Sequence, residues 1–352
     1  MSITTDQLSE QRRLVDIDHY DITVREIVRM SVDNELVRAP EYQRKFRWSE
    51  YDESRLIESV FLGLPVPTIY VATNANGSWD LVDGLQRVST LLHFTLEPDD
   101  AKKLLNKEPL RLTDLEKLSD FNDKIFKQLS IPHQHLFLKR PLRITALNDK
   151  SDESVRFEMF DRLNRGGIAL TDQEVRACIY RGQFSSFLKE LSETSEFKAL
   201  VKLQLAAKND GTMEELVLKF FAYLHHREQF KQKVNYFLNQ YMVLANTSFD
   251  YKTEKALFDK TVAYLSRVFD GKAFLRRGVN VTPLNQLEAA MVAAAEIYLS
   301  GETPVENLHP NWTDDEELVK FSTKGTNAKK SLAGRIERAK AIFSGETVVV
   351  RK

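Results

Sequence analysis

The hydrophobic pattern of the first half of the chain changes repeatedly between helix-like and strand-like periods. Apolar residues spaced three and four apart predict a short helix over 23–30, and a serine cap with a glycine stop predicts another over 49–62. An apolar run then predicts a strand over 66–72. Asn76-Gly77 is a strong hairpin signal, so the chain is expected to return along a second strand that ends at Asp83.

The segment from 97 to 135 has no clear period. Residues 111–112 and 124–129 are compatible with short strands or with turns. His133 and His135 would share one face of a strand, as metal ligands do. No carboxylate or cysteine stands at a suitable spacing nearby, which argues against a metal site. A further strand is predicted over 141–146.

From residue 152 the pattern becomes helical and stays so almost to the end of the chain. Thr171 followed by Glu174 is a capping box that predicts the start of a helix. Further stripes of helical period cover 213–226, 229–244, 254–269, 283–299 and 329–343. We therefore predict three parts: a polar segment over 1–20, an α+β domain over 21–150 and a helical domain over 151–352.

Residues 83–87 (Asp83, Gly84, Leu85, Gln86 and Arg87) form a turn between the return strand and a helix. Such a turn presents free backbone N–H groups and the positive end of a helix dipole, which together attract anions. Gly84 lets the backbone approach a ligand closely. Two interpretations stay open: a ligand-binding turn, or a helix that Asp83 caps while Arg87 pairs with a surface carboxylate.

This stretch resembles the DGQQR signature of the GmrSD-type N-terminal domain family, which belongs to the ParB and sulfiredoxin-like fold group. Three other segments resemble family motifs in the same order: residues 39–48 (PxYQRxxxW), residues 59–67 (SxxxGxPxP) and residues 160–167 (FxxxN with glycines). Leu85 is the departure, because the signature has Gln there. A lost amide in the first helical turn would alter contacts to a ligand.

The resemblance implies an α+β, ParB/sulfiredoxin-like N-terminal domain that binds and hydrolyses a nucleoside triphosphate with Mg²⁺. It assigns catalysis to Asp83, Gln86 and Arg87, with Asp83 also placing the metal. It assigns nucleotide binding to Tyr42, Gln43, Arg44, Gly84, Asn164 and Arg165. From the residues alone, Asn164 and the glycines after it equally well end a helix. We expect the turn at Asp83 to face Asn164 at the junction of the two domains.

The implied biological role is a module of a bacterial phage-defence or restriction-type system that senses or acts on DNA with a separate effector. The alternatives are a ParB-like regulatory switch with little turnover, and a nuclease subunit. Residues 307–312 resemble part of an HNH nuclease site only faintly, and no second catalytic histidine follows them. Any cleavage of nucleic acid is therefore expected from a partner protein or as a weak activity of the ParB-like domain.

Composition and charge narrow these expectations. The 352 residues carry 50 Lys plus Arg against 51 Asp plus Glu, so global charge does not predict nucleic-acid or membrane binding. A single cysteine excludes an internal disulfide, and with no apolar run of membrane-spanning length the simplest expectation is a cytosolic protein. Local basic clusters are Arg276-Arg277 and a helix that carries Lys329, Lys330, Arg335 and Arg338. A solvated helix face is the favoured interpretation of that helix, and a contact with DNA or phosphate is the alternative.

Overall fold

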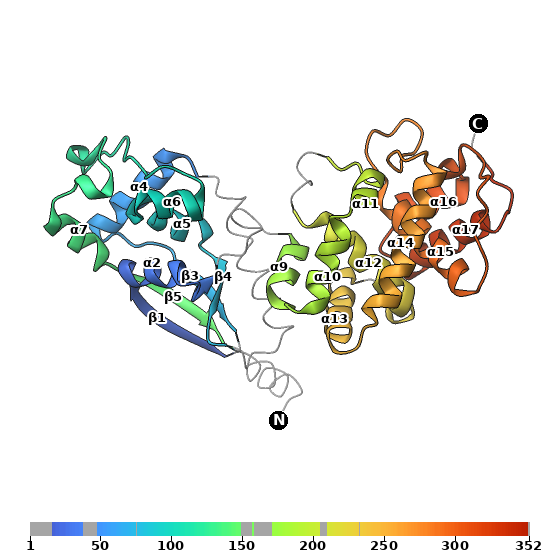
Figure 1. The fold of residues 1–352 in the computed structure, drawn as a ribbon, viewed down its shortest axis with the longest axis horizontal. Helices are drawn as coiled ribbons and strands as arrows, with labels where there is room; N and C mark the ends of the chain where they lie inside the picture. The colour runs from blue at the N-terminus through green and yellow to red at the C-terminus, as the bar shows by residue number, and fades with distance from the viewer. Residues whose placement is uncertain are drawn as a thin grey trace, which may run out of the picture. The chain divides into compact units, whose positions relative to one another are not determined.

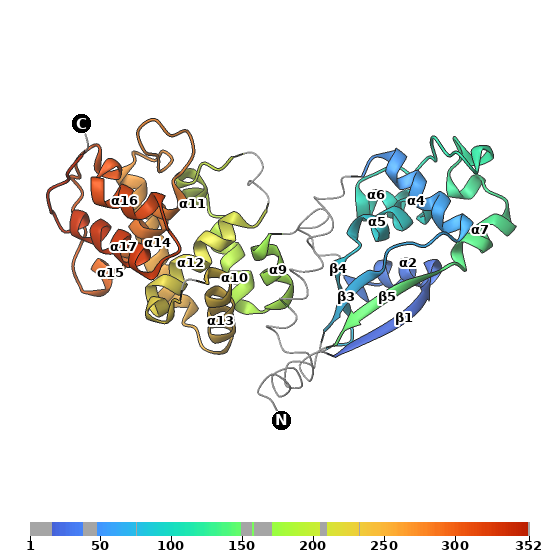
Figure 2. The same ribbon diagram turned by 180° about the vertical axis from the view of Figure 1, so that it is seen from behind.

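The computed structural model of the chain describes residues 16–37, 48–74, 76–148, 157, 171–204, 210–231 and 233–350. The chain divides into two compact units, residues 1–169 and residues 170–352 (Figures 1 and 2). We refer to them as the N-terminal unit and the helical unit. Within the described ranges, no helix has both the length and the apolar character needed to cross a bilayer.

The N-terminal unit contains a mixed five-stranded sheet in the order β1-β5-β3-β4-β2. Its strands are β1 Ile17–Thr23, β2 Leu36–Val37, β3 Ile69–Thr73, β4 Trp79–Asp83 and β5 Pro141–Leu147. Strand β5 is antiparallel to β1 and parallel to β3, while β4 is antiparallel to β3 and parallel to β2. The hairpin predicted at Asn76-Gly77 is the β3–β4 connection, where Gly77 has a φ of 82°.

Helices of the N-terminal unit gather on one side of this sheet, as both ribbon views show (Figures 1 and 2). They are α2 Val24–Val32, α4 Glu50–Leu62, α5 Leu85–Thr95, α6 Pro98–Leu105 and α7 Ile131–Leu138, with 3-10 turns η1 Ser119–Phe121 and η2 Phe126–Gln128. Helix α5 is the central one: it packs against α2 and α4. Its apolar residues Val88, Leu91 and Leu92 are fully buried. Burial of this kind fixes the start of α5 relative to the sheet.

The helical unit is built from nine α-helices in the described residues. They are α9 Asp172–Ile179, α10 Gln183–Ser192, α11 Ser195–Leu200, α12 Thr212–His226, α13 Val234–Thr247, α14 Tyr251–Val268, α15 Leu284–Leu299, α16 Glu316–Thr323 and α17 Lys329–Phe343, with 3-10 turns η4 Arg227–Gln229 and η5 Trp312–Asp314. Helix α15 packs against α12, α14 and α17. Every residue from 286 to 295 is buried, so α15 is the core helix of this unit.

The predicted fold class, an α+β N-terminal part followed by a mostly helical part, is confirmed. The capping box at Ser49 and the left-handed Gly63 bound α4 as predicted. The strand predicted from residue 66 begins only at Ile69, because prolines at 65 and 67 keep that stretch irregular. The ParB and sulfiredoxin-like likeness stays a prediction.

The segment from 97 to 135 departs most from the sequence-based expectation. Residues 98–105 form α6, whose Pro98 occupies the first turn, where a missing N–H costs nothing. Residues 111–112 are irregular, and 126–128 form the turn η2. The strand proposed for His133 and His135 is wrong, because both lie on α7. Residues two apart on a helix point in different directions, and no group of three metal-binding side chains occurs in the described parts of the chain.

Candidate functional site

The candidate site is the junction of β4 and α5, which we call the signature turn (residues 83–87). Gly84 is the N-cap of α5 and has a φ of 105°, in the left-handed region that favours glycine. A Cβ added there would lie 3.1 Å from Cγ1 of Ile69 on the neighbouring strand. Both constraints require glycine at this position. Since Gly84 has no side chain to cap the helix, the first-turn N–H groups of α5 are not capped by the residue that precedes them.

Asp83 is not the cap of α5, contrary to one of the two interpretations of the sequence. Its Oδ1 accepts a hydrogen bond of 2.7 Å from the Gly84 N–H, and its Oδ2 accepts one of 2.7 Å from Nη2 of Arg87. The Asp83 side chain is 44% exposed. The carboxylate is thus held by one hydrogen bond to each oxygen, while nearly half of the side chain stays accessible to solvent.

Arg87 is a buried residue that ties the turn to the segment before β3. Its Nη1 donates to the backbone carbonyls of Pro67 at 2.7 Å and Thr68 at 3.0 Å. Its side chain is 11% exposed. Arg87 is therefore not part of a surface ion pair. It is buried, and it donates hydrogen bonds to three protein oxygens, two of which are backbone carbonyls. Arg87 therefore positions Asp83, and its contact with phosphate stays a prediction.

Gln86 connects the signature turn to the PxYQRxxxW segment. Its Oε1 accepts a hydrogen bond of 3.2 Å from the backbone N–H of Trp48, the last residue of that motif. With Arg87 bonded to Pro67 of the SxxxGxPxP segment, three of the four motif segments meet at the start of α5. Predicted site residues in the remaining stretches lie outside the described residues: Tyr42, Gln43, Arg44, Asn164 and Arg165.

Leu85, the departure from the family signature, has a structural explanation. Its side chain is partly buried and packs against the apolar core of the N-terminal unit. Leucine is therefore compatible with this position, because the contact gains apolar burial where an amide would have to be desolvated. The expectation that Leu85 alters contacts to a ligand stays a prediction.

A buried ionisable group that sequence reasoning missed lies behind the site helix. Nδ1 of His93 on α5 is 2.7 Å from Oε2 of Glu53 on α4, and Nε2 of His93 is 2.7 Å from the Glu108 carbonyl. Nζ of Lys107 lies 3.3 Å from the other Glu53 oxygen. Both ring nitrogens of His93 therefore face oxygen atoms inside the N-terminal unit. The sequence contains one weak signal for this pair: Glu53 and His93 each occur among the apolar residues of a predicted helix.

The basic helix α17 uses two of its predicted nucleic-acid contacts internally. Arg335 is 2% exposed, donates to the Thr326 carbonyl and pairs with Glu288 at 3.4 Å. Arg338 forms two hydrogen bonds to Asp315, of 3.0 and 2.8 Å. These bonds are the main reason that the pKa of Arg338 is raised. The predicted nucleic-acid contact is therefore wrong for Arg335, and Arg338 is engaged within the unit.

Lys329 and Lys330 differ from the two arginines because both are exposed. Nζ of Lys329 donates to the Glu228 carbonyl at 2.8 Å, which anchors the start of α17 to the turn η4. Lys330 keeps the solvated position that the sequence favoured. A contact of these two lysines with DNA stays a prediction.

Together these observations define a class of protein: an α+β domain whose motif segments converge on a strand–turn–helix junction, followed by a helical unit. Residues 24–181 match the family model described as the GmrSD restriction endonuclease, N-terminal domain. This segment is a GmrSD-type N-terminal domain, a component of restriction-type phage-defence systems, and the resemblance seen in the motif segments is confirmed at this level. No curated protein and no solved structure matches the chain.

Proposed function

We propose that the chain is the nucleotide-binding and nucleotide-hydrolysing module of a restriction-type defence system, and that it works with DNA and a separate effector. The observation that carries the proposal is the geometry of the signature turn. A carboxylate fixed by two hydrogen bonds, yet 44% exposed, stands beside a glycine-capped helix start on which three motif segments converge. Fixed geometry and an open face are both requirements of a phosphate site.

The donor set fits a nucleoside triphosphate that carries Mg²⁺. Magnesium in nucleotide sites is usually held by one or two carboxylates and by the substrate's own phosphates, and it keeps several waters. Asp83 would supply such a carboxylate, and the N–H groups at the start of α5 would face the phosphates. When bound, the metal neutralises the charge that develops during phosphoryl transfer.

The chain's own residues have distinct roles in this proposal. Arg87 holds the Asp83 carboxylate in one orientation, so that no binding energy is lost in ordering it. Gln86 keeps Trp48, the last residue of the PxYQRxxxW segment, against the turn by accepting a hydrogen bond from its backbone N–H. Gly84 supplies the left-handed backbone turn that starts α5 close to Ile69, where a side chain would not fit.

A nucleotide-dependent switch is the second candidate, and the Asp83–Arg87 pair favours it. One oxygen of the Asp83 carboxylate is already engaged by a guanidinium at 2.7 Å, so fewer of its lone pairs are available to orient a water molecule. Such a site binds a nucleotide and changes conformation without needing efficient hydrolysis. Turnover measured with and without DNA separates the two functions.

The decisive experiment compares Asp83→Asn with the wild type. The amide keeps an oxygen to accept from Gly84 or Arg87, but it removes the charge needed for a metal. We expect the magnesium-dependent release of phosphate from ATP or GTP to fall by at least about tenfold. The thermal melt should change little.

Asp21→Asn is the matched control in the same unit. Asp21 also pairs with an arginine, Arg143, at 2.8 Å, but this pair joins strands β1 and β5 and not the β4–α5 junction. It should leave phosphate release unchanged. Absence of turnover in the wild type, with nucleotide binding intact, would favour the switch. Absence of both binding and turnover would overturn the site assignment.

A further inference from the structure

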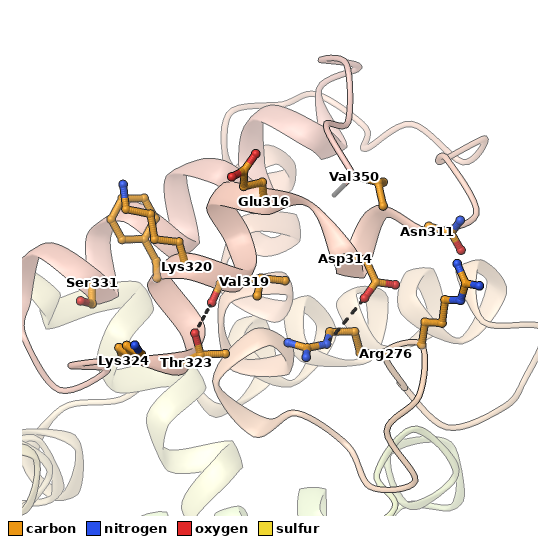
Figure 3. A pocket seen from close by; sticks show the side chains of 12 residues that line it. Arg276, Asn311, Asp314, Glu316, Val319, Lys320, Thr323, Lys324, Ser331 and Val350 are labelled. Atoms are coloured by element: carbon orange, nitrogen blue, oxygen red, sulfur yellow. Dashed lines mark hydrogen bonds and ion pairs between the residues drawn. The ribbon is translucent and has the colours of Figure 1, made fainter. Parts of the chain in front are cut away.

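A cavity of about 630 Å³ lies in the helical unit, far along the chain from the signature turn. It is formed by the start of α17, by α16, by η5 and by the loop before α15, as Figure 3 shows. We call it the α16 cavity, and its lining is Arg276, Arg277, Asn311, Asp314, Glu316, Val319, Lys320, Phe321, Thr323, Lys324, Ser331 and Val350. This volume is within the range of small-molecule sites.

The charge of the α16 cavity sets it apart from the chain as a whole. Four basic side chains line it against two acidic ones, whereas the whole chain has a net charge of −1. Lys320, Lys324 and Arg277 are exposed, and no carboxylate of the described residues lies within ion-pair distance of them. The concave shape concentrates this positive potential.

Arg276 adds a donor that lacks a good acceptor. Its side chain is 26% exposed, and its Nε is 3.6 Å from Oδ1 of Asp314, which is too long for a hydrogen bond. Within the described parts of the chain this buried N–H has no hydrogen-bond acceptor. Figure 3 shows Thr323 between Lys324 and Arg276, with Asp314 on the other side of Arg276 and joined to it by a dashed line. Asp314 therefore does not saturate the guanidinium, and its partly exposed remainder is left to meet an anionic ligand.

The rest of the lining suits an organic ligand better than a free ion. Phe321 and Val319 provide apolar surface, while Asn311 and Ser331 provide hydrogen-bonding groups. Phosphate esters of nucleosides combine anionic oxygens with a flat ring that packs against such surface. We propose that the α16 cavity binds a nucleotide-type phosphate ester, either as a free nucleotide or as part of a single strand.

This inference does not depend on the signature turn, because it rests on residues of the helical unit alone. It also differs from the DNA contact predicted for α17. That prediction used Lys329, Lys330, Arg335 and Arg338, of which the two arginines are engaged internally. The cations of the α16 cavity are a different set, which lies on α16, directly after it and in the loop before α15.

The test uses the full chain and fluorescein-labelled pentathymidylate, with binding followed by anisotropy at about 50 mM salt. The variant is Lys320→Gln/Lys324→Gln. Its matched control is Lys198→Gln/Lys252→Gln, which removes two charges from exposed positions of the same unit outside the cavity. We expect the cavity variant to bind about tenfold or more weakly, while the control pair and Lys320→Arg/Lys324→Arg bind like the wild type.

Competition identifies the source of the phosphate ester. Displacement of the probe by thymidine 5′-monophosphate supports a free nucleotide, and displacement by unlabelled pentathymidylate alone supports a strand. Three results would overturn the proposal. They are a wild-type Kd above about 100 μM, an unchanged affinity in the cavity variant, and an equal loss in the control pair.

Discussion

Arg87 of the N-terminal unit and Arg176 of the helical unit are both buried arginines that pair with an acidic side chain. Arg176 is fully buried and bonds to four side chains, at 2.8 to 2.9 Å: Gln173, Glu215, Asn235 and Asn239. Its carboxylate partner Glu215 binds a second cation, Lys219, at 3.0 Å. Among the described residues, Asp83, the partner of Arg87, has a backbone N–H as its other hydrogen-bond donor.

This difference separates a structural ion pair from a candidate site. Both oxygens of Glu215 are engaged by cations, so the carboxylate has little capacity left for a ligand. Asp83 is oriented by one buried arginine and keeps its outer face in solvent. A burial criterion alone would rank Arg176 above Arg87 as a functional residue, whereas the exposure of the partner carboxylate reverses that order.

Arg176→Ala is expected to have the largest effect on stability. It leaves Glu215 and three amide oxygens without their common donor, which costs about 3–5 kcal/mol for a buried pair. Amide hydrogen exchange should show faster opening across the helical unit. Nucleotide affinity at the signature turn should change little. An unchanged exchange pattern would contradict the network described for Arg176.

Arg87→Ala should rank second, with a loss of about 2–3 kcal/mol, because two backbone carbonyls and Asp83 lose a charged donor. Because Arg87 is buried, we expect a loss of both stability and nucleotide binding, and hydrogen exchange should localise the loss of stability to the N-terminal unit. Arg143→Ala, which breaks an exposed pair with Asp21, is the control and should leave the free energy of unfolding nearly unchanged. Similar losses in the two variants would refute a special role for Arg87.

Glu215→Gln tests the structural role of the Arg176 pair, because this substitution should change how the stability of the protein depends on pH. Burial raises the pKa of Glu215, but Lys219 and Arg176 outweigh it and hold that pKa below its ordinary value. At a pH between the two pKa values, Glu215 therefore binds fewer protons in the folded state than in the unfolded state, where the pKa of a glutamate is about 4.3. Glu215 contributes stability above that pH, and the contribution is lost as the pH falls through the folded pKa.

Denaturant unfolding between about pH 3 and 6 checks this expectation. The wild-type slope of stability against pH should flatten in Glu215→Gln, with a loss of about 1–2 kcal/mol near pH 6. Glu190→Gln, at an exposed carboxylate of the same unit, is the control and should leave the slope unchanged. A slope that persists in Glu215→Gln would assign the acid sensitivity to other groups.

Asp83→Asn should have the smallest effect on stability, under about 1 kcal/mol, because its side chain is half exposed and the amide keeps an acceptor. Its effect on phosphate release is expected to be large, as described above. The pairing of a small stability change with a large activity change is what distinguishes Asp83 from Glu215. A variant that melts normally and still hydrolyses nucleotide would remove Asp83 from the catalytic group.

Local signals explain what could be predicted from the sequence. The hairpin at Asn76-Gly77, the cap at Ser49 and the capping box at Thr171 each depend on a few adjacent residues, and each is confirmed. Helix α7 was missed because its eight residues show no apolar stripe, and only Phe137 is buried. Its helical state comes from tertiary packing, which a hydrophobic period does not report.

The candidate site was predicted in outline but not in its bonding. Residues 83–87 marked the turn correctly, because glycine and a helix start are local features. The partners of Arg87 are carbonyls 19 and 20 residues earlier, and Gln86 meets Trp48 across 38 residues. Every residue has a backbone carbonyl, so the sequence does not show which carbonyls a buried arginine will bind. The partners of Arg87 could therefore not be predicted from side-chain types.

The position of β5 in the sheet has a consequence for how the chain acquires its structure. Ile17 pairs with Leu147 and Thr23 with Pro141. Strand β1 therefore cannot form its ladder until β5, more than 100 residues later, has been synthesised. Strand β5 also joins β1 to β3. On the ribosome, therefore, the β3–β4 hairpin and α5 emerge well before the sheet is complete. A nascent chain that ends before residue 141 contains the signature turn but lacks β5, so its sheet is incomplete. The large sequence separation of the β1–β5 pairing makes completion of the sheet a slow folding step.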